Sequence, residues 1–86
     1  MNPPTVLNID DEPLMRLSMT DALKAVGYEV RAAGTGQEGL HLLNQQVYDI
    51  VVTDLRLPGS DGLELLQHCK QRSPRTEVIV MTAIGS

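Results

Sequence analysis

Three aspartates stand at the ends of two strand-like runs, where together they could hold a cation. Asp10 and Asp11 follow the apolar run 6–9, and Asp54 follows the apolar run 50–53. If these runs are neighbouring parallel strands, the three carboxylates meet at one edge of a sheet. Carboxylates at close range repel each other by about 3–4 kcal/mol per pair at an effective dielectric of about 20, so a cation is needed there. Oxygen ligands suit Mg²⁺, and the pattern predicts a site for phosphoryl chemistry.

The elements that must position these side chains alternate between strand and helix. Apolar, β-branched runs predict strands at residues 5–9, 28–33, 49–53 and 78–81. The last two runs are continuous, which is typical of strands buried on both faces. The order β-α-β-α-β-α-β predicts a parallel sheet covered by helices, with right-handed crossovers. In such sheets ligands bind beyond the carboxyl ends of the strands, where the three aspartates and Thr82 fall.

Three helices are expected between these strands. Pro13 suits a helix start, Thr35 and Glu38 form a capping box, and Asp61 can cap the third helix. Segment 57–62 is expected to be a turn. The side chains predicted to face the sheet are Met15, Met19, Ala22, Leu23 and Val26 in the first helix, Gly39, Leu40, Leu43 and Val47 in the second, and Leu63, Leu66 and Cys69 in the third. His41 and His68 are expected on outer, solvated helix faces.

Size and composition bound the possible functions. The chain has 86 residues and 42% hydrophobic residues, with two Tyr as its only aromatic side chains, so we expect a single domain over 1–86 with an aliphatic core. A net charge of −4 without a basic run argues against nucleic-acid binding by this segment. No run is apolar and long enough to span a membrane, and the N-terminus lacks a signal peptide. With one cysteine, a cytoplasmic location is expected.

Three segments resemble motifs of response-regulator receiver domains, and they occur in the same order. Segment 9–12 resembles the acidic start of that family, 53–62 its phosphorylation loop, and 81–83 the end of its fourth strand. The resemblance covers essentially the whole chain and implies a flavodoxin-like, doubly wound parallel sheet. In that family a further helix, a fifth strand with a lysine and an aromatic switch residue, and a last helix follow. The segment 1–86 is therefore expected to be a partial receiver domain.

The resemblance also implies a role for each matching residue. Asp54 would be the phosphoacceptor for a phosphoryl group from a sensor histidine kinase. Asp11, Asp54 and the backbone carbonyl of Arg56 would ligate Mg²⁺, and Asp10 would bind it through a metal-bound water. These roles describe a signalling module that catalyses only its own phosphorylation, so the chain is not expected to be an enzyme.

Two further positions complete the set that the resemblance implies. Thr82 would be the switch hydroxyl that turns toward the acyl phosphate. The backbone N–H groups of Arg56 and Ala83 would help to hold the phosphoryl oxygens.

Two other functions compete with this interpretation. The chain could be a receiver fragment that cannot switch, or an oligomerising interaction module. The fourth strand would be left at the edge of the sheet, and residues 78–81 contain no charge or proline that would discourage pairing with another chain. This pattern predicts self-association. A phosphatase of the haloacid-dehalogenase type also uses an aspartate at a strand end. That family needs a second aspartate two residues later, and Arg56 stands there.

Overall fold

The computed structural model describes residues 2–54, 56–57 and 60–81, and only the backbone of 56–57 and 60–63. Within these residues a parallel sheet is flanked by helices. The elements are β1 (Thr5–Ile9), α1 (Pro13–Ala25), β2 (Glu29–Ala33), α2 (Gly36–Gln45), β3 (Ile50–Asp54), β4 (Arg56–Leu57), β5 (Ser60–Asp61), α3 (Gly62–Arg72) and β6 (Glu77–Met81).

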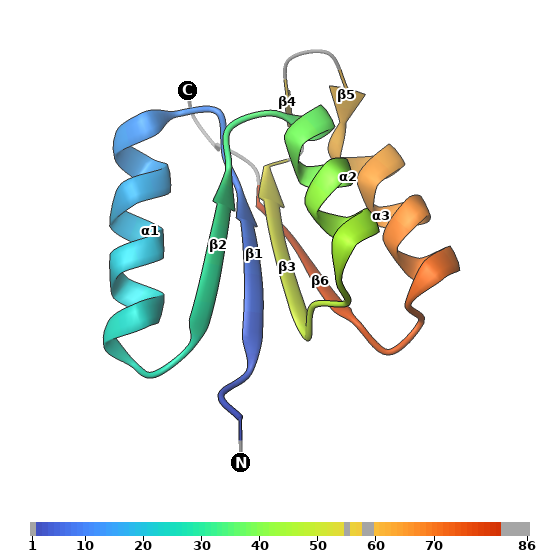
Figure 1. Ribbon diagram of the computed structural model, residues 1–86. Helices are drawn as coiled ribbons and strands as arrows, with labels where there is room; N and C mark the ends of the chain where they lie inside the picture. Colours follow the sequence, from blue (N-terminus) through green and yellow to red (C-terminus); the bar gives the residue numbers. More distant parts are fainter. Residues whose placement is uncertain (1, 55, 58–59, 82–86) are drawn as a thin grey trace.

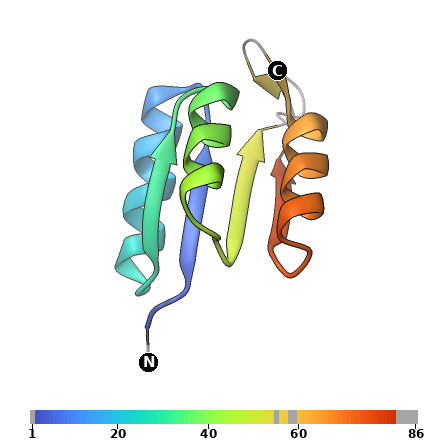
Figure 2. The ribbon, with the colours of Figure 1, turned by 45° about the vertical axis from the view of Figure 1, so that its right-hand side comes forward.

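The sheet has the strand order β2-β1-β3-β6, and all its neighbouring pairs are parallel. Helix α1 covers one face, and α2 and α3 cover the other (Figure 1). Figure 2 shows the same layers after a turn about the vertical axis. The chain moves outward from β1 to β2 and then crosses back to β3, so the strand order reverses between β1 and β3. Ligands of open α/β sheets bind at such a switch point, beyond the carboxyl ends of the strands.

Alternate side chains of the strands form two apolar clusters, one on each face of the sheet. The cluster beneath α2 and α3 is built from Leu7, Ile9, Ala33, Tyr48, Val51, Leu65 and Cys69. The smaller cluster on the α1 face is built from Val6, Val30 and Val52, with Leu23, Tyr28, Ile50 and Met81 at its margin. The core is thus divided between two faces. It is mostly aliphatic, as predicted, but its largest fully buried side chain is the aromatic Tyr48.

Cys69 is a buried core residue, as the sequence predicts. Burial raises the pKa of its thiol, while a hydrogen bond with Thr76 and the charge of Lys70 act in the opposite direction. Thr76 also donates its hydroxyl to the Tyr48 carbonyl at 2.6 Å, and Lys70 Nζ donates to the Thr76 carbonyl at 2.7 Å. These bonds join the end of α3 to the start of β3.

The helix starts follow the capping signals in the sequence. Pro13 is the first residue of α1, and the Glu12 carboxylate accepts the Met15 N–H at 2.9 Å. Thr35 Oγ1 accepts the Glu38 N–H at 3.1 Å, which is half of the predicted capping box. The Glu38 carboxylate accepts from the Gly34 N–H at 3.5 Å instead of closing the box on Thr35. No described helix has both the length and the apolar character that crossing a bilayer requires.

Helix α1 presents a different face to the sheet than its apolar spacing predicts. Met15 and Val26 are 56% and 72% exposed, and Ala22 is also exposed. The half-buried positions of the helix are Arg16, Met19, Thr20 and Leu23. The predicted face is therefore correct only at Met19 and Leu23.

A buried polar group explains this rotation of α1. Asn8 on β1 is 1% exposed and donates from Nδ2 to the Arg16 carbonyl at 3.3 Å and to Thr20 Oγ1 at 3.2 Å. A buried amide without partners would cost about 1–3 kcal/mol, so the helix turns Thr20 toward it. Apolar periodicity cannot detect this constraint, because the partner on the helix is a threonine.

Several predictions around α2 and α3 were wrong in detail. Val47 is exposed, because α2 ends at Gln45 and Gln46 already has an extended backbone. Leu65 is 1% exposed and was missed, whereas Leu66 is only partly buried. The side chain of Leu63 lies outside the described residues.

The predicted turn at 57–62 contains regular structure. Its described parts form the antiparallel pair β4 and β5, in which Arg56 faces Asp61 and Leu57 faces Ser60. Helix α3 begins at Gly62, directly after the predicted cap Asp61.

Strand β6 is only partly buried, contrary to the expectation of a strand covered on both faces. Ile79 is 51% exposed, and Val78, Val80 and Met81 are half-buried. Helix α1 packs against β1 and β2, so it does not cover the β6 side of the sheet.

Candidate metal site

The strand register brings the two acidic segments to the same level of the sheet. Ile9 of β1 pairs with Thr53 of β3, so Asp10, which follows β1, and Asp54, the last residue of β3, lie at the same level of adjacent strands. Asp11 comes one residue later, in the turn that leads into α1. The three predicted ligands therefore gather at the switch point between β1 and β3.

The three carboxylates form a close cluster. One oxygen each from Asp10, Asp11 and Asp54 lies within 4.8 Å of the others. Asp10 is 7% exposed, Asp54 is half-buried and Asp11 is exposed, so the cluster has a buried floor and an open side. At this separation each pair repels by about 1 kcal/mol at the dielectric of water and about 3.5 kcal/mol at an effective dielectric of 20. This all-oxygen, strongly anionic set fits a hard divalent cation such as Mg²⁺.

The backbone and side chain of Asp10 are held by three hydrogen bonds. Its N–H donates to the Ala33 carbonyl at 3.0 Å, its Oδ1 accepts the Glu12 N–H at 2.9 Å, and its carbonyl accepts Arg16 Nη1 at 2.9 Å. These bonds tie the acidic turn to β2 and to α1. The carboxylate of Asp10 is therefore oriented by its surroundings before any ligand arrives.

Thr53 supports the neighbouring end of β3. It is fully buried, and its hydroxyl donates to the Asp54 carbonyl at 3.1 Å. Because this hydroxyl is buried, a phosphodonor that arrives from solvent can reach the Asp54 carboxylate but not the Thr53 hydroxyl. Sequence reasoning assigned no supporting role to Thr53 or Arg16, and only the terminal position of Thr53 in an apolar run could have indicated one.

Of the remaining predicted site residues, only Arg56 belongs to the described part of the chain, and only through its backbone. The backbone of Arg56 lies in β4, next to the end of β3. Thr82 and Ala83 lie outside the described residues, so their roles stay predictions.

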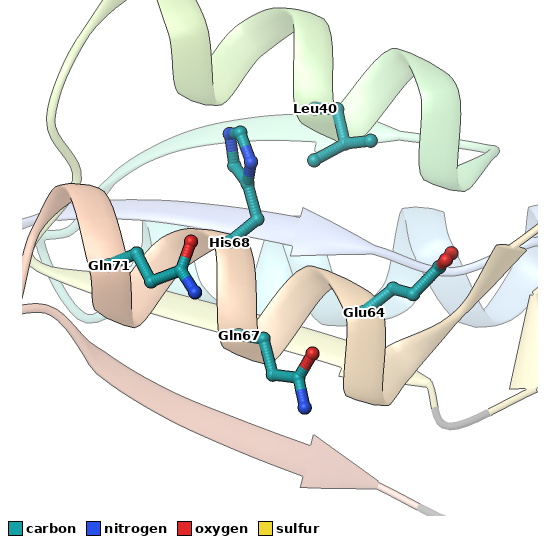
Figure 3. Close-up of a pocket in the computed structure, with 5 residues that line it drawn as sticks. All are labelled: Leu40, Glu64, Gln67, His68 and Gln71. Carbon is teal, nitrogen blue, oxygen red and sulfur yellow. The ribbon is translucent and has the colours of Figure 1, made fainter.

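A separate hollow lies between α2 and α3 (Figure 3), and none of the three aspartates lines it. It encloses about 310 Å³ and is lined by Leu40, Glu64, Gln67, His68 and Gln71. The imidazole of His68 extends from α3 toward α2, and its Nε2 is buried without a hydrogen-bond partner in the part of the chain that is described. His68 is thus not the solvated residue that was predicted, whereas His41 is exposed. This hollow gathers no set of reactive groups comparable with the three aspartates.

Comparison with known proteins agrees with the site. The model of the response regulator receiver domain family matches residues 6–86. The chain belongs to this family. Receiver domains are signalling domains rather than classical enzymes, they interact with histidine kinases, and they bind Mg²⁺ at an acidic pocket.

Individual relatives agree with this assignment. Over 80 residues, or 93% of its length, the chain is 39% identical to the response regulator protein PilR of Pseudomonas aeruginosa, and it spans 18% of that protein. A CheY-like receiver domain from Methanospirillum hungatei superimposes with a TM-score of 0.93 at 29% identity, covering 99% of this chain and 68% of that one. The predicted flavodoxin-like fold of a receiver domain is therefore confirmed.

One solved relative contains the predicted cofactor. The response regulator TrrA of Thermotoga maritima, crystallised in complex with Mg²⁺ and BeF, is 32% identical with a TM-score of 0.88, and the match covers 99% of this chain and 71% of that one.

Proposed function

We propose that this receiver domain is the phosphoacceptor of a two-component phosphorelay, with Asp54 receiving the phosphoryl group from a sensor histidine kinase. The observation that carries this proposal is the meeting of three carboxylates within 4.8 Å at the switch point of the sheet. We further propose that residues 1–86 form one partial receiver domain and that the protein is cytoplasmic. We expect this segment to contact neither nucleic acid nor a membrane.

The donor set fits Mg²⁺, and the proposed ligands follow from it. Asp11 and Asp54 would bind the ion directly, Asp10 through a water, and the Arg56 carbonyl would complete the protein ligands. When bound, the ion neutralises charge on the acceptor carboxylate and on the phosphoryl oxygens.

The residues of the chain perform the transfer by holding the acceptor in place. A carboxylate oxygen of Asp54 forms a bond to phosphorus, and the bond between phosphorus and the donor imidazole breaks. The electron pair of that bond stays on the imidazole nitrogen, and the product is an aspartyl phosphate. Thr82 would then donate its hydroxyl to the new phosphoryl group, with the N–H groups of Arg56 and Ala83 on its other oxygens.

The lysines of the chain are not placed to assist this step. Lys70 donates to the Thr76 carbonyl at the far end of α3, and Lys24 lies in the last turn of α1. A cation that stabilises transferred phosphoryl charge can contribute ~10²-fold or more to a rate. We therefore expect transfer to be slower than in a receiver with a lysine at the site.

Labelling with a small phosphodonor tests the proposal. Acetyl phosphate with Mg²⁺ should add one phosphoryl group to the protein, and the same reaction with excess chelator should add none. Intact-protein mass spectrometry measures both. Equal labelling with and without the divalent cation would reject the proposed site.

Self-association is the second property that we propose. Among the described strands β6 pairs only with β3, and Ile79 is 51% exposed on the face that α1 leaves open. An apolar edge strand of this kind can pair with another chain. Copies of the 86-residue chain would thus cover each other along β6.

We expect the unfolding midpoint of this chain to rise with protein concentration. Linkage adds about 1.4 kcal/mol of stability per dimer for each tenfold increase, because only the folded chain associates. Thermal melts over a hundredfold dilution series, combined with light scattering, measure this. A monomer of 9.4 kDa whose melting temperature is independent of dilution contradicts the proposal. Ile79→Lys should weaken association, while Val47→Lys, at a more exposed apolar residue between α2 and β3, should leave it intact.

A further inference from the structure

The side chain of Arg16 joins three segments around the acidic cluster. It is half-buried on α1, and its Nη1 donates to the carbonyl of Asp10 at 2.9 Å. The same nitrogen lies 2.9 Å from the position that a Cβ on Gly34 would occupy. The guanidinium therefore sits between the turn after β1 and the turn after β2.

We propose that Arg16 is a positioning residue for the metal site, and that Gly34 leaves room for the guanidinium in its bound position. This inference rests on the proposed function, since it concerns the affinity of the same three aspartates for Mg²⁺. Arg16 would act through the backbone of Asp10 and would not touch the ion.

The hydrogen bonds of Asp10 explain how this positioning works. The Asp10 N–H is held by Ala33 of β2, its Oδ1 by the Glu12 N–H, and its carbonyl by Arg16. Together these bonds fix the peptide groups on both sides of Asp10, and they leave Oδ2 without a hydrogen bond to another described residue. Without Arg16 the peptide between Asp10 and Asp11 gains freedom, so both carboxylates leave their preferred orientation.

The backbone conformation of Gly34 is consistent with this role. Its φ is not positive, so its conformation suits any residue, and a glycine is not needed for the turn itself. A methyl group there would meet only the Arg16 guanidinium, the end of a flexible side chain, which would have to shift to make room. Gly34→Ala should therefore displace Arg16 and weaken the site in the same way as removal of the guanidinium.

Mg²⁺ titrations followed by two-dimensional NMR test this inference. Arg16→Met, which keeps the apolar stem, should raise the dissociation constant for Mg²⁺ about tenfold, as is typical when groups that orient metal ligands are lost. Gly34→Ala should raise it similarly in the native background and should have no further effect in Arg16→Met, because the two changes remove one interaction. Arg16→Lys should restore part of the affinity.

Two controls separate positioning from general effects. Arg75→Met removes the same charge from an exposed turn between α3 and β6, and should leave the affinity unchanged. Thr76→Val breaks the buried bond from Thr76 to the Tyr48 carbonyl, at the opposite end of the strands from the aspartates, and should lower stability with little effect on the affinity.

The outcomes distinguish the two proposals. Saturable binding to the native chain with unchanged affinity in Arg16→Met overturns the role of Arg16 alone. Additive effects of Arg16→Met and Gly34→Ala overturn the steric link between them. Absence of saturable binding in the native chain overturns the proposed metal site itself.

Discussion

Asp54→Asn is expected to reduce labelling by acetyl phosphate to background. The substitution preserves the volume of the side chain but removes the ionised oxygen that attacks phosphorus, and a neutral amide is a poor nucleophile. Labelling of both proteins should be followed at saturating Mg²⁺, because loss of a carboxylate also weakens the metal site.

Chemical mapping sharpens this result. Reduction with borohydride converts an aspartyl phosphate to homoserine, so peptide sequencing should find homoserine at position 54 of the labelled native chain. Asp21→Asn, at an exposed position of α1, removes the same charge and should label normally. Homoserine at position 10 or 11, or labelling that persists in Asp54→Asn, would place the acceptor elsewhere.

Asp11→Asn is expected to affect stability and metal binding in opposite directions. Without metal, removing one exposed charge from a cluster within 4.8 Å should stabilise the fold, by about 1 kcal/mol at the dielectric of water for each of the two pairs that Asp11 forms. The same change removes a charged ligand, so the affinity for Mg²⁺ should fall tenfold or more, which corresponds to at least about 1.4 kcal/mol.

Thermal melts with and without Mg²⁺ measure both effects. The native chain and Asp21→Asn should gain melting temperature with Mg²⁺, since a ligand that binds only the folded state stabilises it. Asp11→Asn should have a higher melting temperature than the native chain without metal, and Mg²⁺ should raise it only a little. A parallel gain in Asp11→Asn would remove Asp11 from the set of ligands, and a lower melting temperature without metal would show that repulsion within the cluster is weak.

The parts of the molecule that could be predicted from sequence are those set by strand pattern and strand ends. The runs 5–9 and 50–53 are apolar and end in acids, and parallel pairing of β1 with β3 follows from the alternation of elements. The meeting of Asp10, Asp11 and Asp54 was foreseen for this reason. The register of a buried strand is strongly fixed, because a shift by one residue would move every side chain to the other face of the sheet.

The supporting contacts were harder to foresee, because they depend on long-range polar geometry. Arg16 is an ordinary helix residue in the sequence, and only the folded chain brings it to the Asp10 carbonyl. Leu65 was missed because the capping residue indicates where α3 begins but does not indicate which face of the helix is buried. The pair β4 and β5 has two residues in each strand, which is too short to produce a periodic signal.

The hydrogen bond from Asn8 to Thr20 has a consequence for the conformational ensemble of α1. The helix carries two candidate inner faces, the observed one around Thr20 and an exposed apolar stripe of Met15, Ala22 and Val26. A turn of about 100°, one residue step of an α-helix, would exchange them. The two hydrogen bonds from the buried Asn8 amide to α1 thus set the energy gap between two rotational states. Because Arg16 turns with the helix, the second state would also release the acidic turn, and rotation of α1 and cation affinity would be one coupled equilibrium.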